Sequence, residues 1–320
     1  MNSERSVFVE APARLHLGLI DLRGDLPRRF GGTGAAVRSP SLRLEARPAA
    51  ELTAEGPEAA RVLAYAQRFL AHHGIRAGAN LRLEHTIPAH TGLGSGTQLA
   101  LATARVLAEL NGLPSSAAAL SAAVGRARRS AIGTWVFEHG GFILEGGRRS
   151  NGKTPGPLLF RHALPETWRC VLVIPRDVEG LSGEAEERAF RTLPPPSAEL
   201  IGEISRLVLM LLLPSVVEAD LAGFGRAVTE IQRCVGEVFR EVQGSPFAHP
   251  LVAHTIEALL ACGAAGAGQS SWGPTTYGFV DGDAAARELA SRLGSYLPDH
   301  ATVITTAFDN NGARCGQCSA

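Results

Sequence analysis

The sequence predicts an α+β protein with two lobes. Its 320 residues are 45% hydrophobic, enough to bury a large core and more than one compact domain usually needs. Segments with apolar residues at every second position alternate with segments of helical period, in which apolar residues recur every three or four positions. Residues 151–166 are rich in Pro and Gly and lack either period. We therefore expect one domain over residues 1–160 and another over residues 161–320.

The first lobe is expected to begin with strands. Residues 6–22 alternate around a short break at residues 11–13, which predicts two strands, and residues 41–48 (SLRLEARP) predict a third. Residues 57–74 place their apolar side chains on one helical stripe and end at a glycine, which predicts a helix. Residues 79–88 return to the period of a strand.

A glycine-dense turn then enters a helix within residues 87–110, and an Ala-rich helix follows to about residue 129. Residues 130–147 are punctuated by glycine and end in a predicted strand. The second lobe is expected to contain the following elements: a buried strand at 168–175, three helical patterns across 182–263, a helix at 283–293 and a strand at 301–308.

Composition narrows the possible partners. The chain has 31 basic and 31 acidic residues and a pI near 7.2, so no overall field attracts nucleic acid or an anionic membrane. The N-terminus lacks an apolar run of signal-peptide length, and the densest apolar run, residues 207–214, is too short to span a bilayer. We expect a cytoplasmic protein that binds neither nucleic acid nor membrane.

Cysteine usage indicates no disulfide framework. Cys170, Cys234 and Cys262 lie in apolar segments and are expected to be small buried hydrophobes. Cys315 and Cys318 form a CxxC near the chain end, which is either a metal or redox pair or part of a solvated tail.

The glycine turn is suited to an anion. It contains Gly92, Gly94, Ser95, Gly96 and Thr97 directly before a predicted helix. The first N–H groups of a helix lack partners, and glycines let an anion approach them closely. The segment lacks the Lys-Ser/Thr of a Walker motif and the third glycine of GxGxxG. It is either a phosphate site or a tight connection. The chain has one lysine, Lys153, so a phosphate here must be held by arginine, backbone N–H groups or a metal ion.

Three strings carry a resemblance to a known superfamily. The sequence Pro88-x-x-x-Gly-Leu-Gly-Ser resembles the central motif of the GHMP kinases, in which the turn wraps ATP phosphates. Residues 11–19 (APARLHLGL) resemble the first motif of that superfamily, and residues 263–280 stand where its third belongs. The resemblance implies a two-lobed GHMP-kinase-like fold, with a ribosomal-S5-domain-2-like N-terminal lobe and a ferredoxin-like C-terminal lobe.

A non-kinase branch is more similar still. Residues 14–22 (RLHLGLIDL), 130–147 and 268–279 (GQSSWGPTTYGF) resemble the β-ribofuranosylaminobenzene 5′-phosphate synthase family over nearly the whole chain. The resemblance implies condensation of phosphoribosyl pyrophosphate with a 4-substituted benzoate, 4-aminobenzoate or 4-hydroxybenzoate. Carbon dioxide and pyrophosphate are released, and the product enters tetrahydromethanopterin-type cofactor synthesis. It also implies Mg²⁺ and a homodimer.

The absence of one expected residue favours this branch. Many kinases of the superfamily have an aspartate base after the second motif, where the nearest carboxylate here is Glu138. The synthase reaction needs no strong base, because loss of carbon dioxide restores aromaticity. We consider Arg14, His16 and Glu138 as catalytic candidates, although His16 is equally well explained as a core histidine.

The remaining candidate residues fall into groups by role. For phosphate binding we expect the turn residues Gly92, Gly94, Ser95, Gly96 and Thr97, and for substrate binding Trp135, Gln269, Ser270, Ser271 and Trp272. Core packing is the alternative for the tryptophans. Asp21 is a candidate Mg²⁺ ligand, or simply a turn residue. Further candidate phosphate-binding side chains are the following arginines: Arg28, Arg29, Arg126, Arg128 and Arg129.

Two other functions remain open on the sequence alone. The same fold would serve an ATP-dependent kinase of a small alcohol or sugar acid. A non-catalytic paralogue would bind phosphoribosyl pyrophosphate or ATP without turnover.

Overall fold

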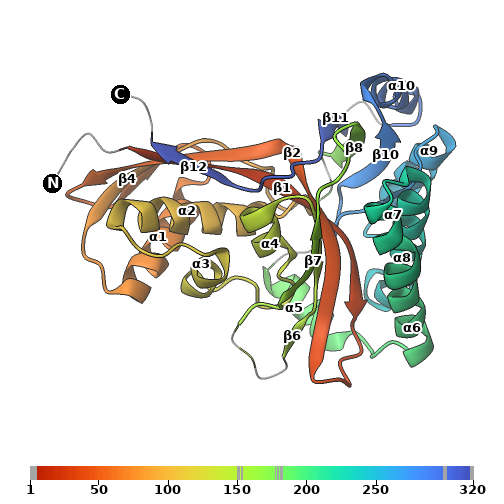
Figure 1. Cartoon of the computed structure of the whole chain (residues 1–320), viewed down its shortest axis with the longest axis horizontal. Helices are drawn as coiled ribbons and strands as arrows, with labels where there is room; N and C mark the ends of the chain where they lie inside the picture. The colour runs from red at the N-terminus through yellow and green to blue at the C-terminus, as the bar shows by residue number, and fades with distance from the viewer. Residues whose placement is uncertain are drawn as a thin grey trace.

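The computed structural model describes residues 6–149, 152, 154–176, 178, 180, 183–297 and 301–317. These residues form two β-sheets, one of eight strands and one of four, with helices packed on both (Figure 1). The predicted α+β class is confirmed.

A long antiparallel pair of strands is the centre of the first sheet. Strand β1 (Val7–Asp21) pairs with β2 (Arg28–Ala49) almost throughout, and the register shifts between Pro12 and Ala13. The sequence predicted two strands here, but β1 is continuous: Pro12 pairs with Ser41 and Ala13 with Val37, so β2 accommodates three extra residues and the pairing resumes on both sides. The other strands of this sheet are β3 (Thr53–Glu55), β4 (Gly78–His85), β5 (Phe142–Glu145), β6 (Arg148–Arg149), β7 (Leu158–His162) and β12 (Arg314–Gln317).

Helices cover one face of this sheet. The predicted helix α1 (Ala59–His73) is confirmed, with Gly74 in the left-handed conformation at its end. It packs on α2 (Ser95–Asn111), which lies against β1 and β2 (Figure 1). Two shorter helices complete the layer: α3 (Ala117–Ala123) and α4 (Ile132–His139).

The second lobe has a four-stranded sheet in the order β11-β8-β10-β9, and helix α8 contacts both β1 and β10. The predicted strand β8 and helix α10 are confirmed at their expected positions. Between them the chain has more helices than the three predicted. The elements are β8 (Trp168–Pro175), α5 (Gly183–Thr192), α6 (Ala198–Leu207), η1 (Val208–Leu212), α7 (Leu213–Val217), α8 (Leu221–Gln243), α9 (Pro250–Ala261), β9 (Ala267–Gln269), β10 (Thr276–Asp281), α10 (Asp283–Leu293) and β11 (Ala301–Ala307).

The chain enters the second sheet only at β8, since β7 still pairs with β5 in the first. The predicted boundary at residue 160 therefore falls within β7. The chain also returns: β12 pairs with β1, so Cys315 lies opposite Val9 rather than in a free tail (Figure 1). Cys318 and Lys153 lie outside the described residues.

The apolar run predicted to be too short for a bilayer is part of a longer helical stretch. A π-helical turn, η1, continues α6 into α7, so that Ala198–Val217 is by length and composition alone long enough to cross a membrane. Only 33% of its apolar window is buried, and the stretch packs along α8 within the fold.

Candidate active site

Strand β1 holds the glycine turn in place. Gly92 and Gly94 both have positive φ, 84° and 77°, which side-chain-bearing residues rarely adopt. The Arg14 N–H donates to the carbonyl of Leu93 at 3.0 Å, and its guanidinium Nη1 donates to the carbonyl of Gly92 at 3.1 Å. The first motif therefore fixes the turn from which α2 begins.

The third motif joins the same turn. The Ser270 hydroxyl donates to the carbonyl of Gly92 at 2.8 Å and accepts from the His16 N–H at 3.0 Å. The Thr275 N–H donates to the carbonyl of Thr91 at 3.2 Å. Ser270 is fully buried, and its hydroxyl links β1 to the turn. Three strings far apart in the sequence thus meet at one point.

Beside this point lies a cavity of about 670 Å³ with a cationic lining. Of the predicted site residues it includes Arg14, His16, Thr97, Ser271 and Trp272. Gln269 and three further predicted arginines line it too. The ionised side chains of the lining are Arg14, Arg61, Arg68, Arg126, Arg128, Arg129, Glu186 and Glu187. This surplus of arginine over glutamate suits a polyanionic ligand.

Two arginines lie close to the start of α2. A Cβ on Gly96 would lie 2.8 Å from Nη2 of Arg61 and 3.1 Å from Nη2 of Arg126. Arg61 pairs with Glu58 at 2.5 Å, whereas Arg126 contacts the Tyr65 hydroxyl and pairs with no carboxylate among the described residues. Since helix N–H groups and a guanidinium converge here, this end of the cavity is built for an anion.

The two motif residues on β1 differ in charge. Burial lowers the pKa of Arg14 to about 10, with Glu186 opposing the shift, so the guanidinium is cationic at neutral pH. Burial and the neighbouring Arg14 lower the pKa of His16 to about 3. The imidazole is therefore neutral across the physiological range and is not a cationic phosphate ligand.

Aromatic side chains form another part of the cavity wall. The Trp272 ring lies 5.2 Å from the ring of Phe190 and 4.4 Å from that of Phe239, and all three line the cavity. The Gln269 amide is used internally: its Nε2 donates to the carbonyl of Ser271 and its Oε1 accepts from the Ala248 N–H. Gln269 therefore shapes the third motif more than it binds a ligand.

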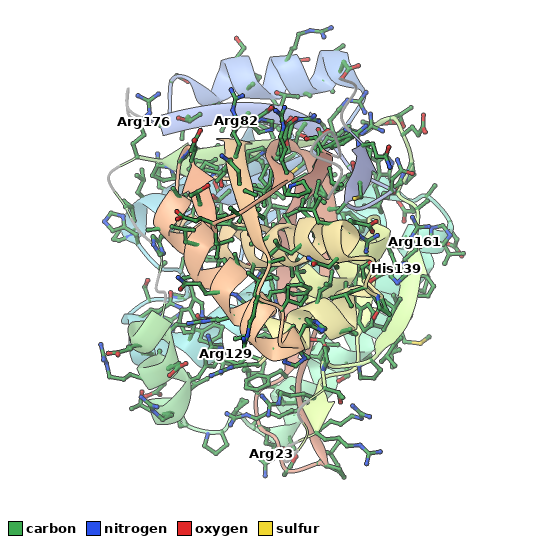
Figure 2. All side chains as sticks on the ribbon, turned by 90° about the vertical axis from the view of Figure 1, so that its left-hand side faces the viewer. Arg23, Arg82, Arg129, His139, Arg161 and Arg176 are labelled. Carbon is green, nitrogen blue, oxygen red and sulfur yellow. The ribbon has the colours of Figure 1, made fainter. Side chains whose placement is uncertain are left out.

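Two predicted residues on α4 lie outside the cavity lining. The Glu138 carboxylate accepts from the Ala117 N–H at the start of α3, and the Trp135 indole donates to the carbonyl of Gly156 at 2.8 Å. Both side chains leave the helix on faces turned away from the cavity. Figure 2 shows the end of this helix, at His139, beside Arg161 and apart from Arg129. The structure does not bring Glu138 or Trp135 to the proposed substrate.

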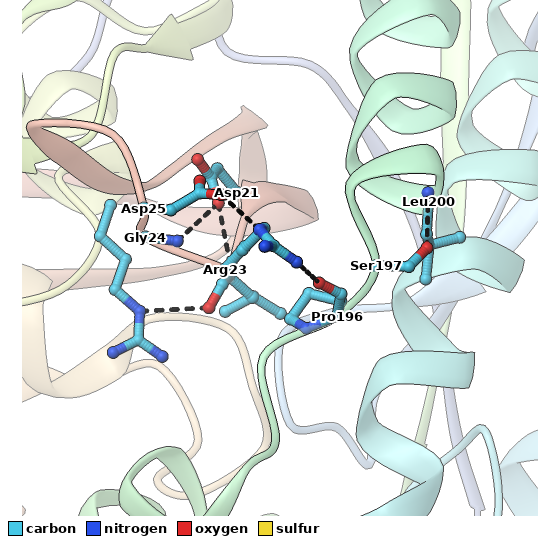
Figure 3. Close-up of polar contacts among 9 residues, drawn as sticks. Asp21, Arg23, Gly24, Asp25, Pro196, Ser197 and Leu200 are labelled. Atoms are coloured by element: carbon cyan, nitrogen blue, oxygen red, sulfur yellow. Dashed lines mark hydrogen bonds and ion pairs between the residues drawn. The ribbon is translucent and has the colours of Figure 1, made fainter.

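Asp21, the predicted Mg²⁺ ligand, is also absent from the cavity lining. Its Oδ1 accepts from the N–H groups of Arg23 and Gly24, which makes it a turn residue (Figure 3). Within the described ranges no group of three or more His, Cys, Asp or Glu side chains is arranged for a metal ion. The residues here do not fit a metal site built by the protein.

Arg28 and Arg29 are used partly in loops. Nη1 of Arg28 donates to the carbonyl of Gly147, and Nε of Arg29 donates to that of Leu22. Arg29 lines a second cavity that shares Arg129 with the first.

A row of polar residues on α1 was not among the predicted site residues. Arg61, Tyr65 and Arg68 recur at spacings of four and three, so they share one face of the helix, and all line the cavity. That spacing indicates a shared polar face, but it does not indicate what the face contacts. Glu186, Phe190 and Phe239 carried no signal of this kind.

A buried carboxylate supports the loop that carries the arginines. Glu145 is fully buried at the end of β5, and its side chain accepts from the N–H of Ala131 at 3.2 Å and of Gly147 at 2.8 Å. Ala131 directly follows the segment 125–130, which lines the cavity. Burial raises the pKa of Glu145 to about 7, although these hydrogen bonds and Arg28 oppose the shift.

We expect Glu145→Gln to reveal this titration in stability. Between the unfolded pKa of about 4.3 and the folded value, the folded chain binds more protons, so the wild type loses unfolding free energy as pH rises through that window. Glutamine has no such loss. We therefore expect the unfolding free energy of the variant, relative to that of the wild type, to rise by on the order of 2 kcal/mol between pH 5 and pH 8. Thermal unfolding at the two pH values measures this difference. An equal difference at both pH values would contradict the assigned ionisation.

Comparison with known proteins agrees with this architecture. Residues 60–137 match the GHMP kinases N terminal domain and residues 212–299 match the GHMP kinases C terminal domain. A homoserine kinase structure from Cytophaga hutchinsonii superimposes with a TM-score of 0.70 at 19% identity, over 97% of both chains. The Methanococcus jannaschii mevalonate kinase superimposes with a TM-score of 0.67 at 13% identity, over 95% of this chain and 98% of the other. The fold is therefore that of the GHMP kinase superfamily, and the glycine turn lies within the matched N-terminal domain.

Sequence relatives define the branch. The beta-ribofuranosylphenol 5'-phosphate synthase of Methanothermobacter thermautotrophicus is 34% identical over 296 residues, which cover 86% of this chain and 89% of the relative. The synthase of the same name from Methanocaldococcus jannaschii is 30% identical over 338 residues, covering 96% and 99%. This chain belongs to the beta-ribofuranosylphenol 5'-phosphate synthase family.

Proposed function

We propose that this chain condenses phosphoribosyl pyrophosphate with a 4-substituted benzoate and releases carbon dioxide and pyrophosphate. The names of its relatives describe a phenol product, which corresponds to 4-hydroxybenzoate as the acceptor. The product is a C-riboside that enters tetrahydromethanopterin-type cofactor synthesis.

One observation carries the proposal: a single cavity combines a cationic helix start with an aromatic wall. Arg14, Arg61 and Arg126 lie at or near the turn, and Trp272 and Phe190 lie on the same cavity. A sugar diphosphate needs the first feature and a benzoate ring needs the second. The α4 segment after the second motif contributes no carboxylate to the lining.

The proposed reaction needs no proton acceptor. The bond from ribose C1 to the diphosphate oxygen breaks, and its electron pair leaves with pyrophosphate. The ring carbon that bears the carboxylate bonds to C1, and the carbon–carbon bond to the carboxylate then breaks to restore aromaticity. In-line attack on an α-diphosphate gives the β product without a covalent enzyme intermediate. A neutral His16 is compatible with this chemistry because no base has to be protonated.

The chain's own contribution is charge stabilisation on the leaving group. The Arg14 guanidinium and the N–H groups at the start of α2 are fixed before the substrate arrives, so little reorganisation is required. We propose that Mg²⁺ accompanies the diphosphate, where it would add positive charge at the leaving group.

The direct test is release of carbon dioxide from carboxyl-labelled benzoate. We expect release from 4-hydroxybenzoate that depends on phosphoribosyl pyrophosphate, with 4-aminobenzoate as the second acceptor to compare. Formation of ADP from ATP with a metabolite mixture, without release of labelled carbon dioxide, would instead identify a kinase. Binding of phosphoribosyl pyrophosphate without any turnover would identify a non-catalytic paralogue.

We further propose that the protein works in the cytoplasm as a homodimer. Light scattering on the purified chain measures its mass in solution, and 33.6 kDa would correspond to the monomer.

A further inference from the structure

A glutamate from the second lobe occupies a pair of donors in the cavity. Oε2 of Glu186, on α5, lies 2.6 Å from Nη2 of Arg129, and its Oε1 accepts from the Trp272 indole N–H at 3.1 Å. Both carboxylate oxygens are therefore held by groups from other segments. Arg129 belongs to the loop of residues 125–130 before α4, and Trp272 belongs to the third motif. An anion with two accepting oxygens fits this pair of donors.

The surroundings are those of a ligand site rather than of a surface ion pair. All three side chains line the cavity, and Arg129 and Glu186 are 28% and 23% exposed. The Arg129 guanidinium also lies 5.2 Å from the centre of the Phe190 ring. Arg14 is close enough for Glu186 to raise its pKa. Glu186 thus offsets the charge of a cluster that the ligand is expected to meet.

We propose that Arg129 and the Trp272 indole form a second anion subsite, which Glu186 fills in the ligand-free chain and vacates when an anionic group of the substrate binds. This inference rests on the proposed function, in which the diphosphate takes the first subsite at the start of α2. The expected occupant is an anionic group with free oxygens that is joined to the rest of the substrate by one bond. Two substrate groups have this chemistry: the 5′-phosphate of the sugar and the carboxylate of the benzoate.

The neighbouring residue offers a matched comparison. Glu187 follows on the same helix, lines the same cavity and makes no hydrogen bond or ion pair with the residues that the structure describes. Replacing either glutamate by glutamine removes the same charge from the cavity. Only Glu186→Gln also breaks the ion pair with Arg129 and removes one of the two oxygens that the donors hold, so a larger effect there separates a subsite from general electrostatics.

The test is calorimetric binding of ribose 5-phosphate and, separately, of 4-hydroxybenzoate to the full chain at constant ionic strength. We expect Glu186→Gln to bind one of these ligands about fivefold more tightly than the wild type, and Glu187→Gln to gain clearly less. The ligand that gains identifies the anion. Arg129→Gln should weaken binding of that same ligand.

Two results would overturn the subsite. One is unchanged or weaker binding of both ligands in Glu186→Gln with an Arg129→Gln variant that binds normally. The other is an equal gain in both glutamine variants. Because binding is measured without turnover, a failure of labelled carbon dioxide release would count against the proposed function and leave this result standing.

Discussion

Replacing Arg14 by methionine is expected to lower kcat/KM by about 10²- to 10³-fold, the cost of losing one well-placed donor at a developing charge. Methionine keeps much of the buried stem but removes the guanidinium. Nη1 of Arg14 holds the carbonyl of Gly92, and its buried Nε has no hydrogen-bond partner among the described residues.

The loss should appear in kinetics more than in stability. A buried cation carries a desolvation cost, which burial of Arg14 already shows by lowering its pKa. Removing the charge relieves that cost and offsets part of the lost hydrogen bond to Gly92. We therefore expect the thermal unfolding midpoint of Arg14→Met to stay near that of the wild type while turnover falls.

Two companion variants make the measurement specific. Arg82→Met removes an exposed arginine from β4 of the same sheet, far from Arg129 in Figure 2, and should leave kcat/KM unchanged. Arg14→Lys keeps the charge without the forked donors and should recover part of the loss. If Arg14→Met turned over at the wild-type rate, Arg14 would be a structural residue only.

The elements that sequence predicted well depend on local order. Period and glycine positions gave helix α1 with its end at Gly74, strand β8 and helix α10, because each depends on neighbouring residues alone. The glycine turn was predicted for the same reason, since its positive φ values follow from residue type at Gly92 and Gly94.

The features that the sequence did not predict depend on the direction in which each helix face or strand edge points in the folded chain. Trp135 and Glu138 belong to a string that resembles a known family, yet helix α4 directs them to Gly156 and Ala117. Arg61 lines the cavity from helix α1, which was predicted from its apolar stripe alone. That stripe did not indicate which partner the polar face meets. The return of β12 to β1 was equally hidden, because pairing between chain ends separated by some 300 residues leaves no local periodicity.

The turn, the first motif and the third motif share one acceptor. The carbonyl of Gly92 accepts from both Arg14 and Ser270, and Ser270 in turn accepts from the backbone of His16. A shift of Gly92 therefore displaces the cationic end of the cavity and the third motif together. This coupling makes Gly92 the position at which a single methyl group should have the largest effect.

We expect Gly92→Ala to lower kcat/KM by at least about 10²-fold and to destabilise the fold by about 2 to 4 kcal/mol. Its φ is 84°, and an added Cβ would lie 2.2 Å from the carbonyl oxygen of Ser270, which is backbone and cannot swing away. Gly94→Ala should be milder in stability, since its Cβ would meet the Arg14 side chain at 3.3 Å, but it presses on the same guanidinium.

Gly112→Ala is the control for backbone strain. It lies at the other end of α2 with a similar φ of 64° and open space around its Cβ, so it should cost about 1 kcal/mol and leave turnover unchanged. Steady-state kinetics and thermal unfolding on the three variants separate the backbone strain of a non-glycine residue at positive φ from the contact of the added Cβ with its neighbours. If Gly92→Ala matched Gly112→Ala in both measurements, the close approach of the turn to Ser270 would have no part in catalysis, and the diphosphate would have to bind elsewhere in the cavity.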